Sequence, residues 1–115
     1  MNQNQPGLPF QQLRVYQYAR IFARAVCTAP IRDTELRDQA TRAAKSMFLN
    51  LAEGLPSYSQ PMRRKYFNTS RNSLCEALAA MDLACAIDKL PSSIYEKAQE
   101  EARPIHRILS TMIRG

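Results

Sequence analysis

The chain has 115 residues, of which 16 are lysine or arginine and 10 are aspartate or glutamate, so its formal net charge is +6. This length is most economically one domain with a modest core, and the surplus of cations predicts a surface that attracts polyanions. No apolar run approaches the ~20 residues that a membrane span requires. The three cysteines include no CxxC pair and follow no signal peptide, so we expect a soluble, cytoplasmic protein with reduced thiols.

The first helix is predicted to begin near Phe10. Residues 1–9 are polar and contain two prolines and a glycine, so we expect a flexible tail before a domain over residues 10–115. The apolar residues of the helix recur at helical spacing and predict a buried stripe of Val15, Ala19, Phe22 and Val26. Ile21 falls on the opposite side, among arginines, and predicts a second contact surface.

The second helix is predicted to begin at Asp33 or Thr34, because Pro30 ends the first helix and either residue can cap the next. Its expected buried face comprises Leu36, Ala40, Ala43, Ala44, Met47 and Leu51. Leu49 lies on its polar side, as Ile21 does on the first helix. Gly54 suits the left-handed position that follows a helix, and Pro56 cannot continue the helix.

Two more helices complete the prediction, one capped by Ser59 and one opening with a capping box at Ser93 and Glu96. The expected core of the third is Phe67, Ser70, Leu74, Ala77, Leu78, Met81 and Cys85. That of the fourth is Ile94, Ala98, Ala102, Ile105, Leu109 and Met112. Composition favours an all-α fold. Four amphipathic helices with short connections therefore predict an antiparallel, up-down-up-down four-helix bundle.

Three motifs occur in order along these helices: LRVY at residues 13–16, NLAEG at 50–54 and SLCE at 73–76. Together they resemble the four-helix-bundle family encoded in intervening sequences of bacterial large-subunit ribosomal RNA genes. That family is similar to the accessory variability determinants of diversity-generating retroelements. The resemblance covers the chain from Phe10 to the C-terminus.

The resemblance implies a homopentameric ring of bundles around a central pore. It also implies association with nucleic acid, RNA or DNA, and with a reverse transcriptase, as in the retroelement proteins. It implies no enzymatic activity, and we expect no cofactor and no membrane partner. The rival interpretation is a structural or protein-interaction oligomer that binds no nucleic acid; an enzyme is the least favoured.

Single polar residues are interpreted as structural. Asn50 and Glu53 share a side of the second helix near its C-terminal end, where a carboxylate needs a cation. We expect Glu53 to pair with an arginine such as Arg71, and Asn50 to satisfy backbone groups where helices or subunits meet. His106, the only histidine, is expected to be packed or interfacial, because a metal site draws on several ligands. We also expect the cysteines to be small buried apolar groups.

The cationic residues form the candidate interface. One account is a merely solvated face. The sharper account joins three helices into a phosphate-binding surface of Arg14, Arg20, Arg24, Arg42, Lys45, Arg63, Arg64 and Lys65. Arg63 and Arg64 oppose the dipole at the start of their helix, so they are not expected to stabilise it, which favours this account. The arginines of the fourth helix are interpreted as complementing its dipole.

Overall fold

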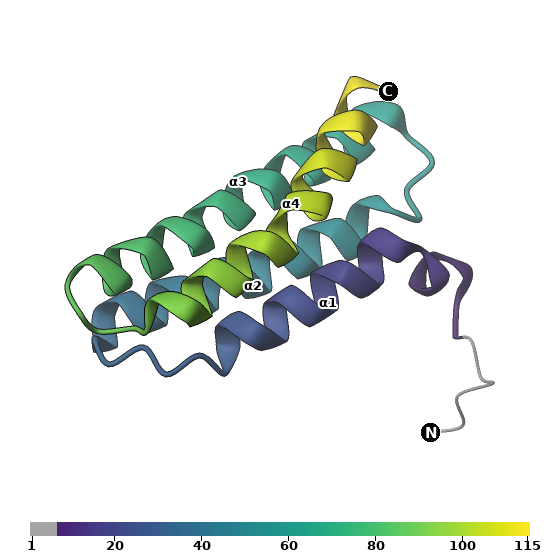
Figure 1. Cartoon of the computed structure of the whole chain (residues 1–115). Coiled ribbons are helices and arrows are strands. Elements are labelled where there is room, and N and C mark those ends of the chain that lie inside the picture. The colour runs from purple at the N-terminus through teal and green to yellow at the C-terminus, as the bar shows by residue number, and fades with distance from the viewer. Residues whose placement is uncertain (1–6) are drawn as a thin grey trace.

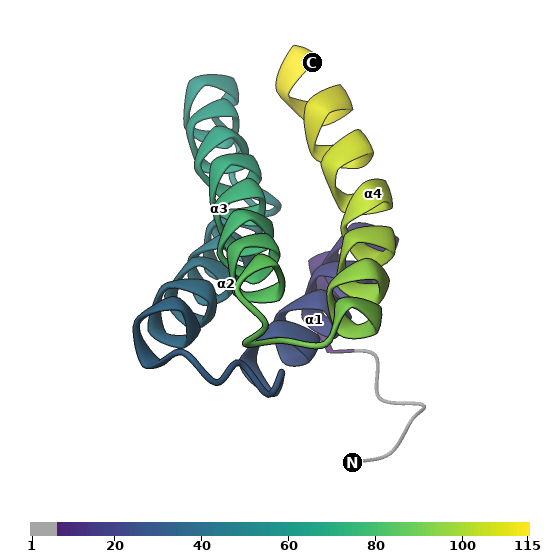
Figure 2. The same cartoon turned by 60° about the vertical axis from the view of Figure 1, so that its left-hand side comes forward.

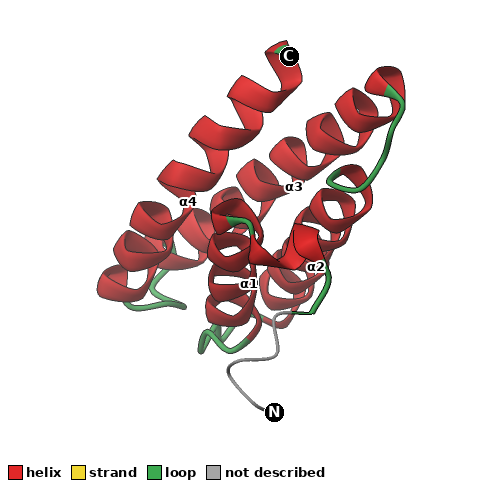
Figure 3. Ribbon diagram, turned by 90° about the vertical axis from the view of Figure 1, so that its right-hand side faces the viewer, coloured by secondary structure: helices red, strands yellow, loops and turns green. Residues whose placement is uncertain are grey.

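The computed structural model describes residues 7–115, and within that range it contains four α-helices, one short 3-10 helix and no strand. The elements are η1 (Pro9–Gln12), α1 (Arg14–Cys27), α2 (Thr34–Gly54), α3 (Gln60–Ala86) and α4 (Ser92–Arg114) (Figure 1 and Figure 3). The four-helix bundle is therefore confirmed. Most of the predicted N-terminal tail, residues 1–6, lies outside the described residues, and its last residue, Pro9, already begins η1.

The four long helices form a closed set of contacts. α1 packs on α2, α2 on α3, α3 on α4, and α4 returns to α1, while the largest of these contacts joins α2 to α3. Figure 2 shows α3 beside α2 and α4 beside α1, with α3 and α4 spreading apart toward the C-terminus. None of the helices in residues 7–115 is both long and apolar enough to cross a bilayer.

The predicted helix starts are correct for α2 and α3 and wrong for α1 and α4. The first helix was predicted to begin near Phe10, but Phe10 lies in η1, and α1 begins at Arg14 because Leu13 between them has an extended backbone. Asp33 caps α2 by accepting a hydrogen bond from the Leu36 amide at 2.9 Å, and Ser59 accepts one from the Met62 amide at 3.4 Å at the start of α3. α4 instead begins at Ser92 with Pro91 in the cap position and no side-chain cap. The chain enters the helix one residue before Ser93, so the predicted capping box does not form.

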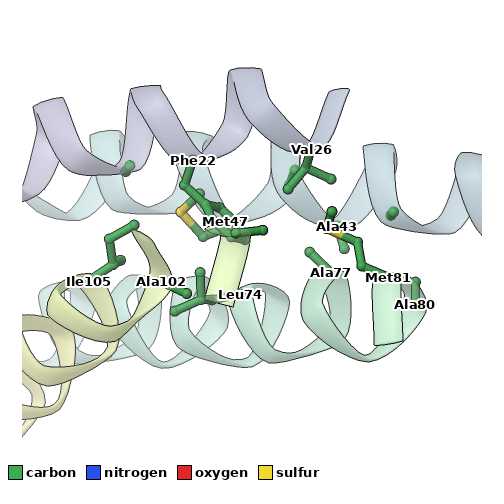
Figure 4. Close-up of a cluster of buried hydrophobic side chains, with 14 of the residues drawn as sticks. Phe22, Val26, Ala43, Met47, Leu74, Ala77, Ala80, Met81, Ala102 and Ile105 are labelled. Atoms are coloured by element: carbon green, nitrogen blue, oxygen red, sulfur yellow. The ribbon is translucent and has the colours of Figure 1, made fainter. Parts of the chain in front are cut away.

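The buried stripes of α1 and α2 are confirmed at every predicted position. In α3 and α4, four predicted core residues are only partly buried: Leu78, Cys85, Ile94 and Met112. Small residues of α3 replace them, since Ser73, Ala80 and Ala84 are buried. The centre of the core is built by Phe22, Met47, Leu74 and Ile105, one side chain from each helix (Figure 4).

A polar seam joins α2 to α3. The Ser70 hydroxyl, fully buried, donates to the Met47 carbonyl at 2.7 Å, and the hydroxyls of Ser46 and Ser73 lie 2.9 Å apart. Asn50 donates its amide to the Ser46 carbonyl at 2.8 Å. Small side chains and hydroxyls let the two helices approach closely, and each buried polar group finds a partner. Asn50 thus binds a carbonyl of its own helix, and its predicted role where helices or subunits meet stays a prediction.

Gly54 does not adopt the predicted left-handed conformation. It is the last residue of α2, and the only positive-φ glycines among the described residues are Gly7 and Gly115. A Cβ at Gly54 would lie 2.7 Å from Cε1 and 2.9 Å from Cδ1 of Phe67, and 3.1 Å from Cβ of Tyr66. Glycine is therefore required here by the close approach of the Phe67 ring and not by backbone conformation.

Contacts between two loops stabilise one end of the bundle, and contacts between aromatic rings stabilise the other. At one end, the Arg32 amide donates to the Lys89 carbonyl at 2.9 Å, and its side chain donates to the Asp88 carbonyl. At the other, the ring of Tyr16 packs on Phe10 and on Phe48, with centroids 5.6 and 5.0 Å apart. That second end holds the connection between α2 and α3 and the C-terminus (Figure 1).

Candidate nucleic-acid interface

The net charge of the protein is concentrated in one half of the bundle. The contact between Ser46 and Ser73 marks a level near its middle. The half with the α2–α3 connection and the C-terminus comprises residues 7–18, 46–73 and 107–115, and we call it the basic end. Its cations are Arg14, Arg63, Arg64, Lys65, Arg71, Arg107 and Arg114, against Glu53 as its single carboxylate. The cations and carboxylates of the other half are equal in number, so the basic end carries the whole net charge of +6.

A hollow of about 260 Å³ lies between α3 and α4, and we call it the α3–α4 groove. Its apolar floor is formed by Leu74, Leu78 and Ala102. Its rim carries Cys75, Gln99, Arg103, His106 and Arg107. Both arginines and the histidine are exposed. The groove thus combines an apolar floor with a cationic rim.

Three further arginines extend this groove toward the basic end. Arg71 donates to the Ser110 hydroxyl at 3.0 Å, so its guanidinium crosses from α3 to α4. Arg64 donates through Nε to the Ile113 carbonyl at 3.2 Å, and Arg114 lies one residue beyond. Within residues 7–115, the hydrogen-bond partners of these guanidinium groups are neutral oxygens. Their positive charges therefore remain available to an anionic ligand.

At the opposite end of α3 and α4, Tyr95 lies near the Asp82 carboxylate. Burial, with smaller contributions from the Asp82 carboxylate and the Cys85 thiol, raises the pKa of Tyr95. A negative neighbour disfavours the phenolate, as it would disfavour a phosphate. The cations between α3 and α4, in contrast, lie from Arg103 toward the C-terminal end of α4.

A second hollow, of about 460 Å³, lies against α1 and α2, and we call it the α1–α2 hollow. Its lining residues are Cys27, Arg37, Asp38, Thr41, Arg42 and Lys45. It brings together the predicted cations Arg42 and Lys45 and adds Arg37, which the sequence argument omitted. Asp38 places a carboxylate among the three cations, and no large apolar side chain lines the hollow.

The remaining predicted cations have different surroundings. Arg14, Arg20 and Arg24 are exposed on α1 but line neither hollow, and Arg64 and Lys65 are exposed at the basic end. The structure therefore brings the eight predicted cations together only in part.

Arg63 is half-buried and serves the fold. Its guanidinium donates to the carbonyls of Leu55 at 2.7 Å and Ser57 at 3.1 Å, and it lies 5.2 Å from the centroid of the Phe67 ring. Leu55 is the C-cap residue that follows α2, so Arg63 binds carbonyls of the chain segment that leaves this helix. Arg63 was predicted not to stabilise its own helix, and these contacts leave that untested; they give Arg63 a structural role between α2 and α3 that a helix dipole does not reveal.

The predicted pairing of Glu53 with Arg71 is also wrong. Arg71 is directed across to Ser110 on α4, while Glu53 is exposed on α2. Ile21 and Leu49, the two predicted contact residues, lie on the surface with 55 % and 62 % of their side chains exposed. Exposed branched side chains on helices of a small bundle are available for contact with another chain.

Two expectations about reactive side chains require correction. His106 is exposed on the rim of the α3–α4 groove, so the packed alternative is wrong, while the interfacial alternative stays a prediction. None of the three free cysteines is buried: Cys27 and Cys75 are exposed and Cys85 is intermediate. Their positions at the edges of the apolar stripes, and not at the centres, explain the difference. Across residues 7–115, no cluster of three or more His, Cys, Asp or Glu side chains is arranged to hold a metal ion.

The most important residues that the sequence argument missed are on α4. Arg103, Arg107 and Arg114 were assigned only to dipole compensation, yet their spacing of four and seven residues places them on one face. That spacing was the available signal. The sequence could not show that Arg64 and Arg71 of α3 donate hydrogen bonds to α4, because this depends on how the two helices pack.

Comparison with known proteins agrees with the bundle and with the three motifs. The family model for the 23S rRNA-intervening sequence protein matches residues 11–111, which is nearly the whole of the described chain. A search of curated proteins found no match. A family match of this extent, over all four helices, shows that the chain belongs to the 23S rRNA-intervening sequence protein family.

Proposed function

We propose that this protein is a non-enzymatic, cytoplasmic oligomer that binds nucleic acid without sequence specificity through its basic end. The single observation that carries the proposal is the confinement of the net charge of +6 to one half of the bundle. A charge that served solubility alone would need no such asymmetry. Phosphate backbones are the abundant polyanions that clustered arginines recognise.

The expected mode of binding is electrostatic. The exposed cations of the basic end include Arg64, Lys65, Arg107 and Arg114, on neighbouring helices. Long cationic side chains on convex helices can contact phosphates in any sequence, whereas reading bases in a duplex requires an element inserted into a groove. We therefore expect similar affinities for mixed sequences of the same length.

The assembly belongs to the same proposal. An antiparallel, up-down-up-down bundle that forms a homopentameric ring would repeat the basic end five times around one axis, which multiplies the contacts available to one nucleic acid strand. Ile21 and Leu49 are the proposed contacts between copies. Such a ring could also hold a nucleic-acid enzyme, such as a reverse transcriptase, on the strand that it binds.

The proposal is tested by fluorescence anisotropy with fluorescein-labelled RNA and DNA of mixed sequence at about 50 mM salt. Arg64→Gln combined with Lys65→Gln should weaken binding of all sequences alike, by roughly tenfold, because two phosphate contacts are lost. The matched control, Lys89→Gln combined with Lys97→Gln, removes the same charge from the opposite half and should have a smaller effect. Absence of binding to every oligonucleotide at this salt would contradict the proposal.

The rival is a structural or protein-interaction oligomer without nucleic acid, and the exposure of Ile21 and Leu49 favours it specifically. The two functions separate in a single preparation. If the protein is oligomeric by light scattering yet binds no oligonucleotide at about 50 mM salt, the structural function stands and the nucleic-acid function fails.

A further inference from the structure

We propose that the α3–α4 groove binds single-stranded nucleic acid, with an unpaired base on its apolar floor and the flanking phosphates on its arginines. This inference rests on the proposed function and deepens it, because it names the form of nucleic acid and the surface that selects it. The groove adjoins the basic end through Arg107, and of the two hollows described here it is the one where an apolar floor meets a cationic rim.

The floor suits the face of a base. Leu74, Leu78 and Ala102 form an apolar surface in a hollow of about 260 Å³, which is large enough for a single planar ring system. The Gln99 amide and the His106 imidazole stand at the rim. Both groups carry a donor and an acceptor, so they can pair with the polar edge of a base whose face lies on the floor.

The rim suits the phosphates on either side of that base. Arg103 and Arg107 lie about 6 Å apart along the axis of α4, and Arg114 lies about 10 Å further on. Arg71 reaches the same line from α3 through Ser110. This arrangement provides a track of cations that leads from the hollow to the basic end. An arginine can also stack its guanidinium plane on a base.

A duplex does not fit this description. In a duplex the bases are stacked and paired, so it presents only phosphates and groove edges, and an apolar floor adds nothing to its binding. A purely electrostatic surface would prefer the duplex, because its charge density is higher than that of a single strand. The proposal therefore predicts tighter binding of the single strand, whereas charge alone predicts tighter binding of the duplex.

The α1–α2 hollow is the internal comparison. It also carries three cations, but Asp38 lies among them and no large apolar side chain lines it. It offers a phosphate contact without a place for a base. Each hollow has one exposed free cysteine, Cys75 in the α3–α4 groove and Cys27 in the α1–α2 hollow, so the two sites can be compared in one molecule.

The first experiment compares three probes of about 12 nucleotides by fluorescence anisotropy at about 50 mM salt. They are a mixed-sequence single-stranded RNA, the duplex of that RNA, and an abasic strand with as many phosphates as the single strand. We expect the single strand to bind at least tenfold more tightly than either of the others. Equal or tighter binding of the duplex would overturn the inference while leaving the proposed function intact. Failure of all three probes to bind would overturn both.

The second experiment locates the strand. Native protein is alkylated with iodoacetamide with and without saturating single-stranded RNA, and the modified peptides are quantified by mass spectrometry. The rate at Cys75 should fall at least fivefold while the rate at Cys27 is unchanged. An unprotected Cys75, or protection of Cys27 instead, would place the strand elsewhere and overturn the inference.

Variants complete the test. Arg103→Gln combined with Arg107→Gln alters two exposed side chains, so folding should be preserved, and the preference for the single strand over the duplex should be lost. The matched control is Arg37→Gln combined with Arg42→Gln, which should lower both affinities and retain the preference. Polyglutamate is the competitor for the rival occupant, an acidic protein segment. We expect polyglutamate to compete less effectively than unlabelled RNA of equal charge. If the two competed equally, binding of a base on the apolar floor would be refuted.

Discussion

The requirement for glycine at position 54 gives the sharpest test of how α2 meets α3. In Gly54→Ala the new Cβ would lie 2.7 Å from the Phe67 ring, closer than carbon atoms can pack. Overpacking of this kind costs about 1–3 kcal/mol. Alanine in a helix gains about 1 kcal/mol over glycine, because Gly54 has helical geometry. The net expectation is a loss of about 1 kcal/mol of stability, with a range of about 0–2.

A second substitution isolates the clash. Phe67→Leu removes the ring atoms that the new Cβ would meet, so in that background Gly54→Ala should show only the helix gain and stabilise by up to about 1 kcal/mol. The sign of the effect of Gly54→Ala therefore reverses between the two backgrounds. Ala52→Gly, on the same helix, measures the difference in helix propensity between alanine and glycine without the contact to Phe67. It should lower the free energy of unfolding by about 1 kcal/mol.

The assay is urea unfolding followed by far-UV circular dichroism, at one protein concentration because self-association would contribute to stability. A double-mutant cycle compares the unaltered protein, Gly54→Ala, Phe67→Leu and the variant with both changes. Their free energies of unfolding give the coupling energy between residues 54 and 67. The reasoning would be refuted if Gly54→Ala stabilised the otherwise unaltered protein as much as it stabilised the Phe67→Leu variant.

Three further predictions concern other contacts. Arg63→Gln should lower the free energy of unfolding, measured in urea, by about 1–2 kcal/mol, because two carbonyls and the Phe67 ring lose their partner. The control, Lys65→Gln, should lower it by less than about 0.5 kcal/mol. Equal losses would contradict the structural role of Arg63. Leu49→Asp should lower the mass measured by light scattering, and an unchanged oligomer would exclude that surface. Cys75 should react with a thiol reagent in the native protein several-fold faster than Cys85, and equal rates would contradict their difference in exposure.

The periodic features of this fold were predictable from sequence because each depends on one helix at a time. The stripes of α1 and α2 were correct at every position, and so were the caps at Asp33 and Ser59. These features follow from the 3.6-residue repeat and from local hydrogen bonding, which involve neighbours in the chain.

Three of the misassigned residues share one physical origin, which is packing between helices. Gly54 suggested a left-handed helix end, and its actual constraint is the ring of Phe67 on the next helix. Arg63 was judged against the dipole of α3, yet its partners are carbonyls of the chain segment that leaves α2. Arg71 was assigned to Glu53, but it faces α4. None of these contacts has a periodic signature in the sequence.

The candidate site was predictable only in outline. A basic surface followed from composition, and five of the eight chosen cations lie outside the basic end or serve the fold: Arg20, Arg24, Arg42, Lys45 and Arg63. The α3–α4 groove depends on the register between two helices. Its apolar floor also includes Leu78, which the sequence argument assigned to the core.

The central claim, that the basic end binds phosphate backbones, is tested most directly by the salt dependence of affinity. A mixed-sequence single-stranded RNA is titrated by anisotropy at several salt concentrations between about 50 and 200 mM. Five phosphate contacts, one each for Arg64, Lys65, Arg71, Arg107 and Arg114, predict that affinity falls roughly a hundredfold over this range. An affinity that does not change with salt, or no binding at about 50 mM, would contradict the account.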